Sequence, residues 1–133
     1  MVNFGLRTGT QMFEAGKNFG KKLINLGKNI ELVSRARIEI EAMRLMVLKA
    51  AKAMDVLGNR EARVWVSMVK AMVPEKVCTI IDQAMQIHGG YGYAEEYSVS
   101  RLFVDARVLS IFEGAEETLA LKVVARELVN NAR

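Results

Sequence analysis

Two short segments gather the residues of this chain that could do chemistry. Residues 86–97 read QIHGGYGYAEEY and residues 112–117 read FEGAEE. Both interrupt the surrounding helical patterns with glycine and place acidic or aromatic side chains beside it. Glycine lets a ligand approach the main chain closely, and a positioned carboxylate can accept a proton. We therefore take these two segments as the candidate sites.

Glu113 is the residue best suited to acid–base chemistry. It lies between Phe112 and Gly114, at a junction between two helical patterns. An apolar setting disfavours the charged carboxylate and raises its pKa towards neutrality, as a general base acting on a weakly acidic carbon requires. The alternative is an exposed acid near a helix N-terminus, where it would complement the helix dipole. The local pattern by itself favours this alternative.

The glycine-rich segment could bind a flat or phosphorylated ligand. Gly89, Gly90 and Gly92 follow Gln86 and leave the backbone with few side chains in the way. The alternative is a turn between two helices that requires positive φ, and a glycine pair alone favours that alternative. The spacing does not match a dinucleotide-binding fingerprint and no strand precedes it, so a Rossmann fold is excluded.

Composition excludes several other classes of function. His88 and Cys78 are the only residues of their types, which leaves no multi-histidine or multi-cysteine metal site within this chain. The net charge of +4 is small, and the basic stretch at 17–28 is better explained as a solvated helix face than as a nucleic-acid surface. No apolar run approaches the roughly 20 residues that span a bilayer. We expect a soluble intracellular protein, either mitochondrial or cytoplasmic, with no nucleic-acid partner and no stable membrane insertion.

Long helices must position the two segments, because apolar residues recur at three-four spacing and the chain has a single proline. The pattern predicts a weak helix over 4–17, long helices over 24–57 and 60–88, and further helices over 98–110 and 116–131. Gly58-Asn59 should end the first long helix, and Pro74 should bend or briefly interrupt the second. We predict an all-α fold: a single domain over 1–133, an up-and-down helical bundle of the four-helix-bundle type whose first helix is truncated.

Apolar stripes identify the side of each long helix that should face the core. In the first long helix the stripe consists of Met43, Met46, Val47, Ala50, Met54 and Leu57. In the second it consists of Val64, Met68, Ala71, Met72, Val77, Ile80, Ile81, Ala84 and Ile87.

Four motifs occur in a characteristic order in the second half of the chain. They are QIHGGYGYAEEY at 86–97, RLFVDAR at 101–107, IFEG at 111–114 and VARE at 124–127. In order and spacing they resemble the C-terminal domain of acyl-CoA dehydrogenases, which is a helical bundle, and Phe19-Gly20-Lys21 resembles a further segment of it. The resemblance extends from Phe19 to the end of the chain. A complete member of that family also has an N-terminal helical domain and a middle β-domain.

The resemblance implies a catalytic role for Glu113. In the family the matching carboxylate removes the α-proton of an acyl-CoA thioester while the β-hydrogen leaves as hydride to FAD, giving a trans-2-enoyl-CoA. Gly114 would leave room for the acyl chain, and Tyr93 would line the substrate cavity. A core position for Tyr93 is an equally good interpretation.

The resemblance also implies a shared cofactor site. Gln86, Gly89 and Gly90 match the segment that packs against the ADP part of an FAD bound mainly by a neighbouring subunit, and Phe19 matches an aromatic residue that meets the same nucleotide. FAD is therefore the expected cofactor, acyl-CoA the expected substrate, and a homodimer or homotetramer the expected assembly. No metal is implied.

Several residues depart from the family pattern. Gly16, Asn18, Ala115 and Glu117 replace donors, or add negative charge, where FAD phosphates and adenine would lie. An alternative function is therefore a non-catalytic helical oligomerisation module derived from this family. We expect the isolated 133 residues to be inactive, because the part that holds the flavin ring is not among them.

Overall fold

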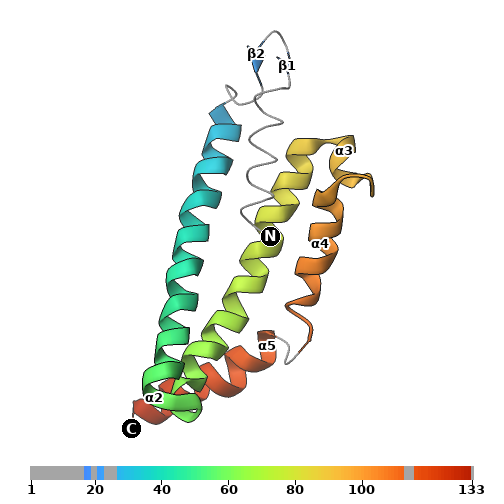
Figure 1. Ribbon diagram of the computed structural model, residues 1–133. Helices are drawn as coiled ribbons and strands as arrows, with labels where there is room; N and C mark the ends of the chain where they lie inside the picture. The colour runs from blue at the N-terminus through green and yellow to red at the C-terminus, as the bar shows by residue number, and fades with distance from the viewer. Residues whose placement is uncertain (1–16, 19–20, 23–26, 113–115, 133) are drawn as a thin grey trace. The chain divides into compact units, whose positions relative to one another are not determined.

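The computed structural model describes residues 17–18, 21–22, 27–112 and 116–132 of the chain (Figure 1). Helices dominate this part, which confirms the predicted all-α class. Its elements are β1 (Lys17–Asn18), β2 (Lys21–Lys22), α2 (Gly27–His88), α3 (Gly90–Tyr93), α4 (Ser98–Val108), α5 (Glu116–Leu119), the π-helix η2 (Ala120–Ala125) and α6 (Arg126–Asn131). The strands β1 and β2 form an antiparallel ladder in which Lys17 lies opposite Lys22. The predicted helix over 4–17 lies outside the described residues, apart from Lys17 in β1.

The long element α2 consists of two helical limbs joined at Gly58. Gly58 has φ 80° and ψ 170°, a backbone conformation that ends the first limb and starts the second. Such a conformation is open almost only to glycine, so the predicted stop at this residue is confirmed. The backbone stays helical through Pro74, however, and the predicted interruption does not occur. Pro74 is buried, although a proline inside a helix removes one helical hydrogen bond.

The chain divides into two compact units. The first contains the described residues of 1–40 together with Val77–Ala106, and the second contains Glu41–Lys76 together with the described residues of 107–133. The candidate segment 86–97 lies in the first unit, and the described residues of the segment 112–117, which are Phe112 and residues 116–117, lie in the second. The organisation of residues 1–133 as a single domain stays a prediction.

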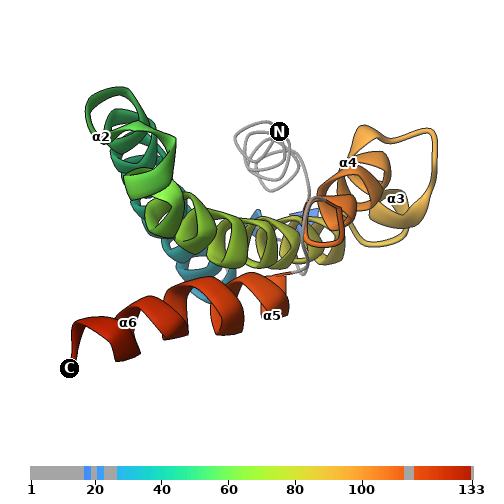
Figure 2. The same ribbon diagram turned by 90° about the horizontal axis from the view of Figure 1, so that it is seen from below.

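The first unit packs α4 beside the last turns of α2, as Figures 1 and 2 show from two directions. The stripe predicted for this part of α2 is buried, since Ile80 is 3% exposed and Ile81 1% exposed. From α4, Val99 and Ala106 are buried. Removing an isoleucine of this size from water contributes about 1.5–3 kcal/mol. This packing fixes where residues 89–97, which connect the two helices, can lie.

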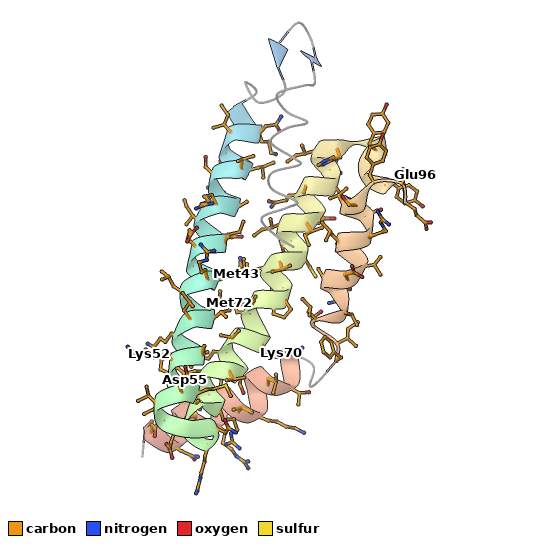
Figure 3. The ribbon with its side chains drawn as sticks, in the orientation of Figure 1. Met43, Lys52, Asp55, Lys70, Met72 and Glu96 are labelled. Atoms are coloured by element: carbon orange, nitrogen blue, oxygen red, sulfur yellow. The ribbon has the colours of Figure 1, made fainter. Side chains whose placement is uncertain are left out.

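The second unit is built on the hairpin that Gly58 creates. In Figure 3, Met43 and Met72 lie between its two limbs, and Met43 is 5% exposed. The ammonium of Lys49 lies 4.0 Å from the ring centroid of Trp65 on the opposite limb. The predicted stripe is wrong towards the hairpin end, where large apolar side chains remain exposed: Val47 (43%), Met54 (42%) and Leu57 (55%).

The last helical stretch continues from α5 through η2 into α6 without a break (Figure 2). Its bounds, Glu116 and Asn131, confirm the helix predicted over 116–131. The π-helical turns inside it were not predicted. Helix α4 ends at Val108, two residues before its predicted end, because residues 109–112 form a turn.

Candidate functional site

The glycine-rich segment begins where α2 ends. Gly89 has φ 59° and ψ −137°, and its amide donates to the carbonyl of Gln86 at 3.2 Å. This backbone conformation strongly favours glycine. His88 is buried, and its Nδ1 lies 2.7 Å from the carbonyl of Ala84. Because a carbonyl only accepts, Nδ1 carries the proton. Gly89 therefore confirms the turn, and a positive φ, that the glycine pair predicted.

Gly90 and Gly92 differ in what surrounds them. A Cβ atom on Gly92 would lie 2.3 Å from the carbonyl oxygen of Met85, so this glycine is required for α3 to approach α2. A Cβ atom on Gly90 would meet nothing within 4 Å, and Gly90 is exposed. Gly89 is explained by its backbone conformation and Gly92 by its close packing. Neither reason applies to Gly90, so nothing within this chain requires glycine at that position.

The surface around these glycines carries aromatic side chains. Tyr93, the last residue of α3, is 85% exposed, and Gln86 is exposed on the last turn of α2. The rings of Tyr91 and Tyr97 lie 5.1 Å apart, tilted by 48°. The Ser100 hydroxyl is 3.0 Å from the carbonyl of Tyr97, which ties the turn to α4. The segment offers open backbone and aromatic faces to a ligand.

The second candidate segment is preceded by a hydrogen-bonded turn at the end of α4. The amides of Ile111 and Phe112 both donate to the carbonyl of Val108, at 3.0 and 3.2 Å. Ser110 is 4% exposed; its hydroxyl donates to the carbonyl of Arg107 at 3.0 Å and accepts a short hydrogen bond from the Arg107 guanidinium. Residues 107–112 are therefore joined to one another by backbone and side-chain hydrogen bonds directly before Glu113.

Three predicted site residues, Phe19, Glu113 and Gly114, lie outside the described residues. Within the described part of the chain, no three His, Cys, Asp or Glu side chains are grouped so that they could hold a metal ion. None of the helices described there is both long enough and apolar enough to cross a membrane. Gln86, Gly89, Gly90 and Tyr93 all belong to the first unit, so the structure brings these four together at the junction of α2 and α3.

Sequence reasoning missed Lys70. Its ammonium donates to the carbonyl of Leu109 and lies 4.7 Å from the ring centroid of Phe112, directly before Glu113. One signal could have found it: Lys70 is the only charged residue between Arg63 and Glu75. A solitary charge in an apolar run usually has a partner elsewhere in the fold.

Comparison with known proteins identifies the family. Residues 6–129 match the family described as "Acyl-CoA dehydrogenase, C-terminal domain". The chain belongs to the acyl-CoA dehydrogenase family. The matched range includes both candidate segments, and it agrees with the four motifs on which the resemblance was based.

Individual relatives agree with this assignment. Mouse acyl-CoA dehydrogenase family member 10 is 40% identical over 86% of this chain, which covers 11% of that protein. A Mycobacterium abscessus protein assigned to the acyl-CoA dehydrogenases has the same fold, with a TM-score of 0.95 and 35% identity over 99% of this chain and 32% of its own. Butyryl-CoA dehydrogenase from Megasphaera elsdenii gives a TM-score of 0.87 at 30% identity, over 96% of this chain and 33% of its own. The chain thus spans a third or less of the length of these relatives.

Proposed function

We propose that this chain is the catalytic-base and oligomerisation domain of an FAD-dependent acyl-CoA dehydrogenase, which oxidises an acyl-CoA thioester to trans-2-enoyl-CoA. The observation that carries the proposal is the family match over residues 6–129, which includes the glycine-rich segment and Glu113 together. Under this proposal the Glu113 carboxylate removes the α-proton of the thioester. FAD, when bound, supplies the acceptor for the hydride that leaves the β-carbon.

The geometry around Gly90 supports an FAD contact. The exposed Gly90 backbone has open space where a side chain would be, and Gln86 is exposed four residues earlier. These features suit a nucleotide that arrives from outside this chain, because backbone amides and a side-chain amide can bind it without displacing the core. In the proposal, Gln86, Gly89 and Gly90 contact the ADP part of an FAD bound by a neighbouring subunit, and Phe19 contacts the same nucleotide.

An exposed apolar surface on α2 supports a homodimer or homotetramer. Leu45, Leu48 and Val56 are 67%, 59% and 69% exposed, and helix periodicity brings them within about 80° of one another on the first limb. Apolar side chains of this size on one face are typical of a surface that a partner covers. A second copy of the chain is the proposed partner.

The test joins these residues to the flavin-binding portion of an acyl-CoA dehydrogenase and follows the FAD absorbance when butyryl-CoA or palmitoyl-CoA is added. We expect bleaching of the flavin, and loss of bleaching in Glu113→Gln, which keeps the side-chain shape but removes the base. Glu127→Gln, a change of the same type on α6, is the matched control. A Glu113→Gln protein that still reduces bound FAD at the unaltered rate would exclude Glu113 as the base.

A second candidate function is a non-catalytic oligomerisation module. It is favoured by Ala115 and Glu117, which replace a donor and add a negative charge where the nucleotide would lie in the family. The two candidates differ in FAD binding, so titration of the joined protein with FAD separates them. Self-association without any FAD binding would support the module and contradict the enzyme.

A further inference from the structure

Lys70 occupies an unusual position on the second limb of α2. It is half-buried and is flanked by apolar residues on both sides, from Val66 to Val73, with Ser67 as the only other polar residue. Figure 3 labels it on the second limb of α2. Withdrawing an ammonium from water is costly unless it gains hydrogen bonds or a favourable charge environment. The group that binds the Lys70 ammonium therefore indicates why a lysine is found at this position.

The partner lies 39 residues further along the chain. The Lys70 ammonium donates a short hydrogen bond to the carbonyl oxygen of Leu109, and it lies 4.7 Å from the ring centroid of Phe112. Both contacts fall within the second unit. The two target residues bracket the turn 109–112, so a single side chain holds both ends of it.

The carbonyl of Leu109, which directly follows α4, accepts its hydrogen bond from Lys70. The carbonyls of Arg107 and Val108 accept hydrogen bonds from the backbone of the turn itself, whereas the carbonyl of Leu109 accepts from Lys70. The last carbonyls of a helix lack partners within the helix and carry partial negative charge. A lysine is well suited to this place, because it supplies a donor and a positive charge together.

We propose that Lys70 is a positioning residue for the catalytic base. It ties the turn 109–112 to α2 and so sets the point from which the chain continues into Glu113. Because Glu113 follows Phe112 directly, the orientation of this turn sets the direction in which the chain continues after Phe112. This proposal rests on the proposed function, because it takes Glu113 as the catalytic base. A displacement of about 1 Å in a catalytic group can cost on the order of a hundredfold in rate.

The first test measures the turn itself in the 133-residue chain by amide hydrogen exchange. In Lys70→Met, we expect the amides of Ile111 and Phe112, both bonded to Val108, to exchange about tenfold faster, because the turn opens locally more often. In Lys70→Arg, which keeps a charged donor, exchange should stay close to wild type. Lys49→Met removes a cation–π contact on the other limb and is the matched control that should leave both amides unchanged.

Unchanged exchange of Ile111 and Phe112 in a folded Lys70→Met variant would overturn the proposal. If the Lys70→Met variant loses its helical circular dichroism, and so does not fold, an NMR measurement on the wild-type protein tests the proposal instead. The ε-methylene protons of Lys70 should be shifted upfield by the Phe112 ring, and Phe112→Leu should abolish the shift. If the ε-methylene protons of Lys70 had the chemical shift of an exposed lysine, the proposal would be overturned.

The second test uses the FAD-loaded protein described under Proposed function. In single-turnover reduction by butyryl-CoA, Lys70→Met should lower the reduction rate about tenfold to a hundredfold. The Kd for butyryl-CoA should stay unchanged, and Lys70→Arg should recover most of the rate. A rate equal to wild type in Lys70→Met would overturn the proposal. A wild-type protein that binds FAD but never reduces it would instead reject the proposed function, and the exchange test would still decide whether Lys70 holds the turn.

Discussion

Replacing Gly92 with alanine would place a Cβ atom 2.3 Å from the carbonyl oxygen of Met85, 2.9 Å from its carbonyl carbon and 3.0 Å from its Cα. All three atoms belong to the backbone of α2, so no flexible side chain can move aside. Separations under 3.0 Å are essentially never seen for real Cβ atoms. Helix α3 must therefore move away from α2, which strains the turn held by the hydrogen bond from the Gly92 amide to the Gly89 carbonyl, 2.9 Å long.

The size of the effect follows from two opposing contributions. Forcing an extra carbon into a filled site costs typically about 1–3 kcal/mol. Alanine recovers at most about 1 kcal/mol relative to glycine inside a helix. The free energy of unfolding of Gly92→Ala should therefore fall by about 1–2 kcal/mol, because the clash is with backbone and lies at the severe end of the range.

Neighbouring glycines provide controls within the same segment. At Gly90 an added Cβ atom would meet nothing within 4 Å, so Gly90→Ala should leave the free energy of unfolding unchanged or raise it by up to about 1 kcal/mol. At Gly89 the positive φ makes any side chain unfavourable, and Gly89→Ala should cost about 1–3 kcal/mol. Gly90→Ala is thus expected to be the most stable of the three variants, and Gly89→Ala and Gly92→Ala are both expected to be less stable than the wild type.

Urea unfolding of the chain, followed by circular dichroism at 222 nm, measures this ranking. With a denaturant slope of about 2 kcal/mol per molar, the midpoint for Gly92→Ala should fall by roughly 0.5–1 M. The reasoning would be refuted by a Gly92→Ala variant that is as stable as the wild type, or by a Gly90→Ala variant that is the least stable of the three. The second result would mean that Gly90 is required for folding and would remove its support for a ligand contact.

Other expected outcomes concern the second unit. Gly58→Ala, at φ 80° and ψ 170°, should lower the free energy of unfolding by about 1–3 kcal/mol, measured by thermal or urea unfolding; equal stability would mean that the hairpin does not need this conformation. Lys49→Met should lower the free energy of unfolding by about 0.5–1 kcal/mol through loss of the contact with Trp65, and it should change the tryptophan fluorescence of the folded state. Unchanged fluorescence would mean that Lys49 does not contact Trp65. Glutamate at both Leu45 and Val56 should shift the chain towards monomer in sedimentation experiments, because it places like charges in the proposed interface; an unaltered assembly would exclude this face.

Much of the fold could be predicted from local pattern. The start of α4 and both limits of the stretch from Glu116 to Asn131 follow from apolar periodicity, which is a property of neighbouring residues only. The reversal at Gly58 could be predicted for the same reason, because the conformation it adopts is intrinsic to glycine. The turn at Gly89 was predicted equally well. In each case the deciding interaction lies within one helical turn of the residue concerned.

Other features could not be predicted in this way. Pro74 remains inside a continuous helix and is buried there, although proline by itself favours an interruption. The short helix α3 forms inside what the sequence indicated as a break, and its bounds depend on how closely it approaches Met85. The exposure of Leu57 also contradicts the stripe on which it lies, since periodicity identifies a face without identifying what covers it.

The sequence by itself determined the helical class, the reversal at Gly58 and the family motifs that single out Glu113, because these depend on residue types and their spacing along the chain. The tertiary structure decided the separate roles of the glycines: Gly92 is needed for the approach to Met85, while Gly90 faces open space. It also decided the role of Lys70, whose partners lie 39 and 42 residues away along the sequence. The physical reason is that the cost of a Cβ atom or of a half-buried charge depends on what the rest of the chain brings within a few ångströms of it.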